Sequence, residues 1–551
     1  MEYLNKFRST VSSTANSIAA QVTQALPGNP IFREYDVKNP VSIWLFEKRQ
    51  IEKWPKHEKE AFPELLKRGV NQLTRLRHPR ILTIDRTLEE SRDSFAFCTE
   101  PVFASLANVF GDKENVEESP KLESFADVEI KHGLFQLSEA LAFLHNDAKI
   151  FHGNICPASI VINSRGAWKL SGFEFCVLGS PNPAGKTTFE AKEYDRGAMS
   201  VMQPTLDYAA PELINGSKCD VYVDIFSLGM LGASLFNSCK PVLPSKGMLD
   251  TYRTKMDAMN RGSISDTLWF KHVPQIFGSD LKACLHQTPE LRPDAYQLTK
   301  IGYFDDPALK TLNYLESLMQ MDNSQKMTFF KGLPQILDKF SNRPLLQKIM
   351  PCLADEFNNP ELVPFVLPSI FFIAEQVDNN EFSTQVFPSL LPVFRLQKPY
   401  QIVLLLLQKM PLLLKKTPEN DIKKHVLPLI YNSVCNENPR IQELCLSIVP
   451  TVGKLIDRDA MKTQLLPKLI KLVLEGSVLS LARSSLVMLG QIITQSRTMD
   501  GKRSNSAGAA KNQQSRAGNI DGRFWASSNW HMKTNVLASA ENNVQKLYCR
   551  F

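Results

Sequence analysis

The run FHGNICPASIV at residues 151–161 decides the fold of this chain. The residues IVI at 160–162, which overlap the end of this run, and WKL at 168–170 predict two short strands around the turn NSRG at 163–166. The second strand leads into a further loop, SGFEF, at 171–175. One strand pair therefore connects two polar loops, and the motifs around them identify the segment.

These stretches stand in the order and spacing of protein kinase motifs. The run at 151–161 sits where a kinase has its catalytic loop HRDLKPEN, and KLSGFEF at 169–175 occupies the place of the metal-binding DFG. An intact APE follows at 210–212, and DIFSLG at 224–229 matches the start of a large buried helix. LRP at 291–293 matches the arginine that pairs with the APE glutamate. Five matches in this order predict a protein-kinase-like α+β domain.

The positions that carry out phosphoryl transfer hold the wrong residue types. The reaction needs a base, metal ligands, a lysine on the phosphates and a covering glycine loop. The degenerate positions are Trp44 for the lysine, Gly69 for the helix glutamate, Asn154 for the base, Cys156 for the loop lysine, Ser159 for the metal-holding asparagine and Gly172 for the DFG aspartate. No glycine lies between Gly28 and Gly69, so the phosphate-covering loop is missing. We therefore expect no catalytic residue, no metal site and no cofactor, ATP included.

The motif residues that survive are those that stabilise the kinase fold. We expect His152 and Phe173 to stack within the larger lobe and Asp224 to hold the backbone of the catalytic loop. We expect Glu212 and Arg292 to pair. This division predicts a fold that is kept after catalysis is lost. The alternative is an atypical kinase that still binds ATP and transfers phosphate weakly.

Four segments follow from the sequence pattern: 1–30, 31–305, 306–495 and 496–551. The second is the kinase-like domain, which includes a long helical pattern at 128–145 and strand-like runs at 41–46, 81–84 and 95–99. The third is rich in leucine and marked by two interleaved proline series, Pro351, Pro388, Pro428 and Pro467, and Pro334, Pro368, Pro411 and Pro450. Two proline-marked helices in every ~40 residues is the period of HEAT or armadillo arrays. The alternative is an irregular helical bundle.

The two ends of the chain differ from the body. Residues 9–32 carry no charge, and apolar residues recur at helical spacing from Leu4 to Leu26. This amphipathic segment predicts either weak peripheral membrane contact through residues 1–26 or packing on the next domain. Residues 496–551 read as a flexible basic tail.

Composition limits the class of protein. The 551 residues are 43% apolar and 22% charged, an ordinary globular mixture. The net charge is +7, but Arg497–Phe551 alone holds nine basic and three acidic residues, so the body is nearly neutral. A neutral body argues against nucleic-acid binding and a nuclear or RNA-linked scaffold. Ten scattered cysteines without a CxxC pair predict a reduced, cytoplasmic protein without a zinc site.

A degraded kinase followed by HEAT-type repeats resembles the SCY-like (Scyl) pseudokinases. The resemblance is greatest to their coated-vesicle-associated kinase branch. It is carried by LKRGVNQLTRLRHPRIL at 66–82, LEESRDSFAFCTEPVFASLANV at 88–109, GAWKLSGFEFCV at 166–177, FFKGLPQIL at 329–337 and NPELVPFVLPSI at 359–370. The family usually retains the strands around the glycine loop and a long tail with clathrin and adaptor motifs. Neither is found here, which suggests an alternative splice form or an imperfect gene model.

The resemblance implies a non-catalytic scaffold or adaptor in clathrin-associated vesicle trafficking. Its expected partners are clathrin and adaptor coat components. Its expected location is peripheral, on clathrin-coated vesicles, the trans-Golgi network and endosomes, with traffic to the plasma membrane. The alternative that the resemblance implies is an atypical Ser/Thr kinase acting on coat adaptor subunits.

Overall fold

The computed structural model describes residues 41–112, 125–181, 183, 187–216, 219–261, 270–452, 456 and 460–475. The predicted N-terminal amphipathic segment, the basic tail and the last part of the repeats lie outside these residues. The described chain up to Glu316, together with Lys339–Lys348, forms one compact unit. Ser317–Asp338 and the chain from Ile349 onward form a second.

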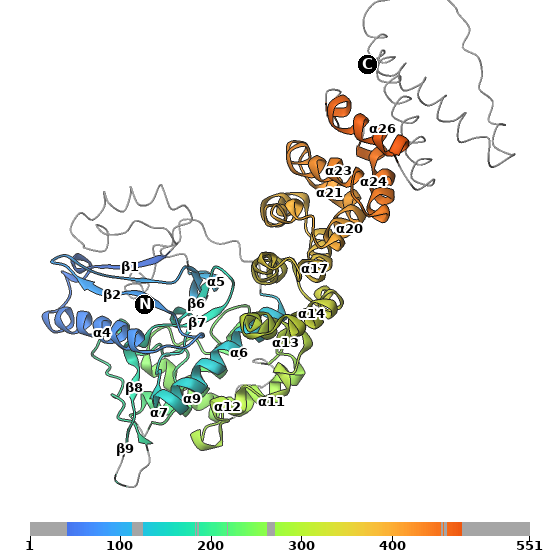
Figure 1. The fold of residues 1–551 in the computed structure, drawn as a ribbon. Coiled ribbons are helices and arrows are strands. Elements are labelled where there is room, and N and C mark those ends of the chain that lie inside the picture. Colours follow the sequence, from blue (N-terminus) through green and yellow to red (C-terminus); the bar gives the residue numbers. More distant parts are fainter. Residues whose placement is uncertain are drawn as a thin grey trace, which may run out of the picture. The chain divides into compact units, whose positions relative to one another are not determined.

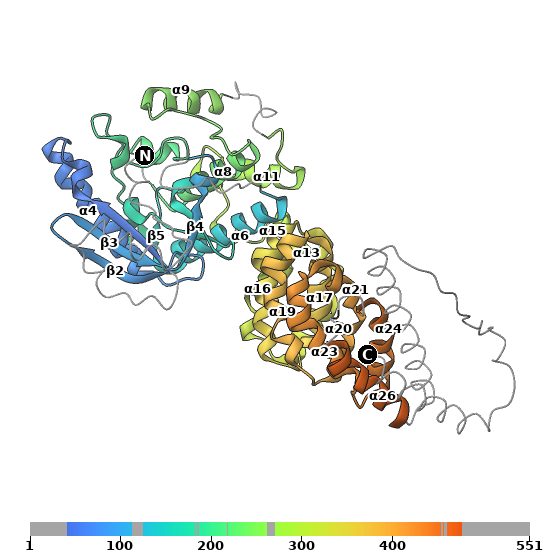
Figure 2. The same cartoon turned by 90° about the horizontal axis from the view of Figure 1, so that it is seen from above.

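The first unit begins with a small antiparallel sheet in the order β1-β3-β2. Its elements are β1 (Ser42–Glu47), helix α4 (Lys56–Arg75), β2 (Ile84–Glu90) and β3 (Ser94–Thr99). Trp44 and Phe46 alternate with less buried neighbours on β1, as expected for a strand with one face in the core. Phe46 packs edge-on against Phe62 of α4, which lies alongside the sheet (Figures 1 and 2). The strand predicted at 81–84 is misplaced, because β2 begins only at Ile84.

The larger part of this unit is mainly helical. Its strands are β4 (Val102–Ser105), β5 (Ile150–Phe151), β6 (Ile160–Asn163), β7 (Trp168–Leu170), β8 (Val177–Leu178), β9 (Ser180–Pro181) and β10 (Thr187–Thr188). Its helices are α5 (Leu106–Val109), α6 (Asp127–Phe143), α7 (Pro211–Ile214), α8 (Tyr222–Phe236), α9 (Leu249–Asn260), α11 (Gln275–Cys284), α12 (Ala295–Leu298) and α13 (Pro307–Glu316). The predicted hairpin is confirmed as β6 and β7, and the whole confirms the kinase-like α+β fold.

Helix α8 is the centre of this larger part. Residues 223–235 are all buried, so the helix has no solvent-facing side over three turns. A helix that is apolar all round has to be enclosed by other elements. Helices α6 and α11 pack against it, and Gly229 allows Cys284 and Leu285 to approach its backbone.

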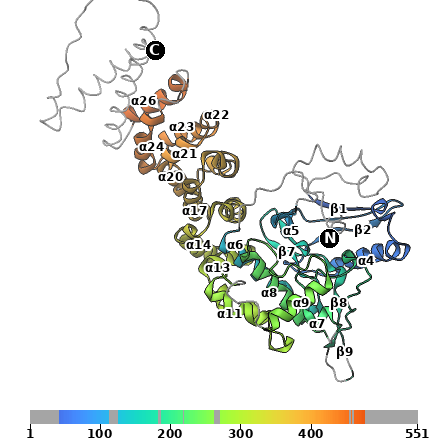
Figure 3. The same cartoon turned by 180° about the vertical axis from the view of Figure 1, so that it is seen from behind.

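The second unit is a helical solenoid, as the proline period predicts. Its main helices are α14 (Asn323–Gly332), α16 (Met350–Asp355), α17 (Val363–Gln376), α19 (Phe387–Leu390), α20 (Tyr400–Gln408), α21 (Met410–Lys416), α23 (Leu427–Val434), α24 (Pro439–Val452) and α26 (Leu466–Glu475). Contacts run from α14 to α17, α20 and α24 in turn, so each repeat covers the apolar face of the next (Figures 1 and 3). No helix in the described part of the chain is long and apolar enough to cross a membrane.

A π-helical turn precedes each proline of the first series. These turns are Leu345–Ile349, Phe382–Val386, Ile422–Val426 and Met461–Leu465, and each ends directly before an apolar residue and its proline. Proline lacks an N–H, and its ring collides with the carbonyl four residues earlier. One wider turn removes that collision and lets the helix continue. The proline period is therefore also a period of widened turns, which the sequence alone did not indicate.

Residues 339–348 return to the first unit and bind along α6. The guanidinium of Arg343 donates to both carboxylate oxygens of Glu129, at 2.9 and 2.7 Å. The Lys348 ammonium lies 2.5 Å from Nδ1 of His132, which is fully buried. Burial and this ammonium lower the pKa of His132 to about 4, so its ring is neutral at pH 7 and can accept the hydrogen bond. The kinase-like unit thus extends beyond residue 305.

Two glycine substitutions should change stability in opposite directions. A Cβ at Gly133 of α6 would overlap the buried indole of Trp168, whereas a Cβ at Gly278 of α11 meets no atom within 4 Å. Gly133→Ala should destabilise the first unit by ~1–3 kcal/mol through overpacking. Gly278→Ala should stabilise it by about 0.5–1 kcal/mol through helix propensity. Thermal unfolding of the full chain measures both, and a gain in stability for Gly133→Ala would contradict the packing described.

Candidate functional site

The Asp224 carboxylate fixes the loop that stands in the place of a catalytic loop. Asp224 lies in the first turn of α8 and is fully buried. Its oxygens accept hydrogen bonds from the backbone N–H of His152 at 2.7 Å and of Gly153 at 2.8 Å. Nε2 of His145 lies 3.0 Å from the same carboxylate. A buried carboxylate is tolerated only when it is bonded in this way, so loop and helix are fixed together.

His152 connects this loop to the segment that follows β7. Its ring meets Phe173 edge-on, with 4.8 Å between ring centroids, and its Nε2 lies 2.9 Å from the carbonyl oxygen of Ser171. Gly153 has φ +74°, and a Cβ there would come within 2.8 Å of the Phe175 carbonyl oxygen. Only glycine suits a residue in that conformation with a carbonyl so close. The two loops therefore form one rigid substructure.

Asn154, at the position of the base, has a structural contact. It is buried, and its side-chain oxygen accepts a hydrogen bond from the backbone N–H of Thr205 at 2.9 Å. An amide has no proton-accepting group near neutral pH, and here its oxygen is already bonded to the chain. The residue ties the loop to the segment before the APE motif.

Cys156 and Ser159 also bond within the loop. The Ser159 hydroxyl accepts from the backbone N–H of Cys156 at 3.0 Å and donates to the Cys156 carbonyl at 2.9 Å. The backbone carbonyl of Ser159 accepts a hydrogen bond from the Ser171 hydroxyl at 2.9 Å. Both residues are fully buried, so neither offers an atom to a ligand outside the chain. Within the described residues there is no cluster of three or more His, Cys, Asp or Glu side chains that could hold a metal ion.

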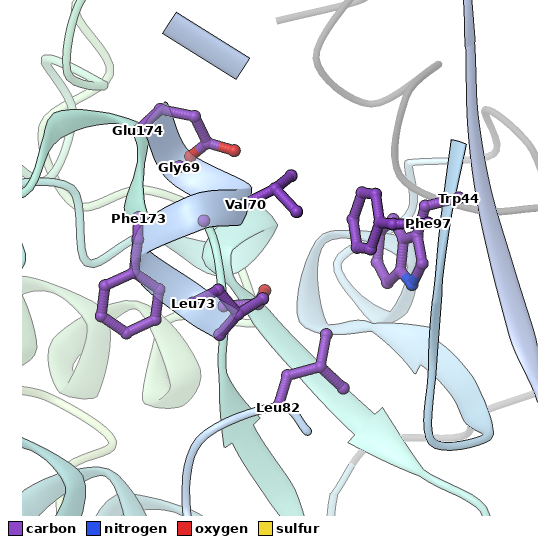
Figure 4. A pocket seen from close by; sticks show the side chains of 10 residues that line it. Trp44, Gly69, Val70, Leu73, Leu82, Phe97, Phe173 and Glu174 are labelled. Carbon is purple, nitrogen blue, oxygen red and sulfur yellow. The ribbon is translucent and has the colours of Figure 1, made fainter. Parts of the chain in front are cut away.

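Glu174 fills the space that Gly69 leaves on α4. A Cβ at Gly69 would lie 2.8 Å from Cγ of Glu174, so no larger residue fits there without a shift (Figure 4). Gly172 precedes it with φ +77°, a conformation that suits glycine. No role for Glu174 was predicted from the sequence. Its position in SGFEF, where DFG has glycine, was the available signal.

Trp44 occupies the position of the phosphate-binding lysine. Its indole is 3% exposed, stacks on Phe97 with 5.7 Å between centroids, and donates its N–H to the Thr99 hydroxyl at 2.8 Å. The cavity between Trp44, Phe97 and Gly69 measures about 30 Å³ (Figure 4). One water needs ~10–15 Å³ on this scale, so this cavity has room for water.

The thiol of Cys176 is not an activated nucleophile. Cys176 follows the Glu174 segment, and burial raises its pKa to about 11. A thiol with such a pKa remains protonated and is a weak nucleophile at neutral pH. Arg68 of α4 donates to the carbonyl oxygen of the same residue at 2.5 Å, which holds α4 against this segment.

Glu212 and Arg292 form a buried bidentate ion pair. Nη1 and Nη2 of Arg292 donate to the two carboxylate oxygens at 2.5 and 3.1 Å. The arginine also donates to the carbonyls of Tyr222 and His286, and its guanidinium lies 4.9 Å from the ring centroid of Phe226. The arginine side chain is fully buried and the glutamate side chain is 10% exposed. The pair thus connects the APE motif to α8.

Comparisons with known proteins agree with this architecture. The protein kinase domain family matches residues 39–304. Human SCY1-like protein 2 is 44% identical over 520 residues, which cover 89% of this chain and 55% of the relative. The protein kinase-like protein SCY1 of Saccharomyces cerevisiae is 28% identical, over 89% of this chain and 64% of the relative. A Dictyostelium discoideum relative, 23% identical over 70% of this chain and 42% of its own length, is named a probable inactive serine/threonine-protein kinase. The chain thus spans about half the length of these relatives.

Removal of Arg292 should unfold the kinase-like unit more readily than removal of an exposed arginine. Arg292→Ala leaves the Glu212 carboxylate buried without its partner, which typically costs ~3–5 kcal/mol. Arg196→Ala is the matched control, because Arg196 and Asp250 pair at 2.8 Å with side chains 61% and 79% exposed. Such a pair contributes at most about 1 kcal/mol. Urea unfolding of the full chain, monitored by hydrogen exchange of α8, compares the stability of the two variants. Equal effects would contradict a structural role for the buried pair.

Proposed function

The chain belongs to the SCY1-like family of kinase-like proteins, and from that premise we propose that it is a non-catalytic pseudokinase scaffold. The observation that carries the proposal is the hydrogen bond from the Thr205 backbone to the side chain of Asn154. The group at the base position already serves the fold. The same holds for the Ser159 hydroxyl, which bonds within its own loop.

The chemistry of phosphoryl transfer supports this proposal. The step depends on positioning and on metal ions that neutralise charge on the phosphates. A positioned base typically contributes 10²–10⁴-fold to the rate of such reactions. Here the base position is an amide, Gly172 has no side chain to hold a metal, and Trp44 has no charge for the phosphates. We propose that no ATP or other cofactor is bound for catalysis.

We propose that the partners are proteins of clathrin-associated transport, namely clathrin and adaptor coat components. The resemblance to the coated-vesicle-associated branch supports this choice. The solenoid supports it as well, because stacked helical repeats present extended surfaces suited to protein partners. The protein would then lie peripherally on clathrin-coated vesicles, the trans-Golgi network and endosomes. Residues 1–26 would add a weak membrane contact.

A phosphotransfer assay tests the absence of catalysis. Full-length protein and the Asn154→Ala variant are incubated with labelled Mg-ATP and purified adaptor subunits. For both proteins we expect no more label incorporation than in the blank without either protein. Because an amide has no catalytic role here, the variant should match the wild type. Incorporation by the wild type that Asn154→Ala abolishes would contradict the proposal and favour the weak adaptor kinase.

Proximity labelling in cells tests the partners separately. Tagged full-length protein should label coat and adaptor proteins above a cytoplasmic control. A list dominated by nuclear proteins would overturn the trafficking proposal and leave the non-catalytic proposal intact.

A further inference from the structure

The backbone that joins β3 to β4 connects the two three-stranded sheets, β1-β3-β2 and β4-β6-β7. It consists of Glu100, Pro101 and Val102. In extended backbone, residues two apart direct their polar groups to the same edge. The carbonyl of Glu100 and the N–H of Val102 therefore suit a flat base that offers a donor beside an acceptor. The Watson–Crick edge of adenine is such a group.

Hydroxyl groups of the chain itself already bond this pair of backbone groups. The Val102 N–H donates to the Ser42 hydroxyl at 2.8 Å. The Thr99 hydroxyl donates to the Glu100 carbonyl at 3.0 Å. Ser42 is 5% exposed and Thr99 is fully buried, so neither bond is replaced readily by water. The Val102 donor is thus satisfied without a ligand, and one of the two lone pairs of the Glu100 carbonyl oxygen is already bonded.

The strand register explains why these two hydroxyls lie here. Ser42 begins β1 and stands opposite Thr99, the last residue of β3. Trp44, two residues further along β1, donates its indole N–H to the same Thr99 hydroxyl at 2.8 Å. A chain of hydrogen bonds therefore runs from Trp44 through Thr99 to Glu100, and successive bonds of this kind strengthen one another.

The joining segment is also anchored from its other side. The Glu100 carboxylate accepts from the Lys169 ammonium at 2.8 Å and from the Thr83 backbone N–H at 3.0 Å. The two charged side chains are only 12% and 22% exposed. The segment is held in place, so a ligand could not bond to it by displacing the backbone.

We infer that Ser42 and Thr99 exclude purines from the cleft by occupying its base-binding edge. The exclusion is separate from the loss of catalytic groups at Asn154 and Gly172. A purine would have to break the bond between Ser42 and Val102 inside a buried site, where a displaced hydroxyl has no water to bond. This inference rests on the proposed function in one respect: both state that no nucleotide is bound.

Hydrogen exchange at Val102 tests this inference in the full chain, with adenosine as probe and no metal. In the wild type, millimolar adenosine should leave the exchange of this amide unchanged. Ser42→Ala frees the amide, so its exchange should become about tenfold faster, the factor expected for one lost hydrogen bond. Adenosine should then slow it again. Ser138→Ala is the matched control, because its buried hydroxyl bonds the Leu134 carbonyl within α6.

Three outcomes would overturn the inference. The first is that adenosine slows exchange of the Val102 amide in the wild type. The second is that Ser42→Ala leaves the exchange rate of this amide unchanged. The third is that Ser42→Ala speeds the exchange but adenosine does not slow it again. Ser42→Cys provides a second, nearly isosteric variant if Ser42→Ala does not fold, because sulfur is a weak acceptor for the Val102 N–H, and it should allow adenosine protection of the same peptide. Adenosine binding by the wild type together with a blank phosphotransfer assay would remove this inference and leave the proposed function standing.

Discussion

The buried carboxylate of Asp224 is the constraint on which the rest of the kinase-like unit depends. It receives the backbone N–H groups of His152 and Gly153, and it has no exposed surface. Leaving such a charge without donors would cost several kcal/mol. The loop must therefore keep its conformation whether or not it performs chemistry. The contacts of His152 with Ser171 and Phe173 extend that rigidity to the next loop.

Several positions where a kinase has catalytic groups hold side chains that contact the rest of this chain. The Trp44 indole stacks and donates a hydrogen bond where a lysine would stand, and Glu174 occupies the space beside Gly69. Asn154 bonds the backbone of Thr205. Trp44 and Asn154 thus make hydrogen bonds inside the chain at positions where a kinase has its phosphate-binding lysine and its base.

The residues whose roles follow from motif spacing could be predicted from the sequence. Asp224, Glu212 and Arg292 could be named because each belongs to a motif of fixed order, and the solenoid because its prolines are periodic. Contacts that depend on strand register or on distant segments were out of reach. Ser42 bonds Val102, 60 residues away, and residues 339–348 return to α6 across a long separation. The π-helical turns arise from helix geometry before a proline, which no residue pattern had indicated.

Thermal unfolding of the full chain with Mg-ATP is the most direct test of the proposal that the kinase-like unit binds no nucleotide. Ligand at a hundredfold excess over its Kd would stabilise the folded state by about 2.7 kcal/mol. With Trp44, Gly69 and Gly172 in place, we predict the same melting temperature with millimolar Mg-ATP, with EDTA added, and with neither. A rise in melting temperature with Mg-ATP that EDTA removes would contradict this account.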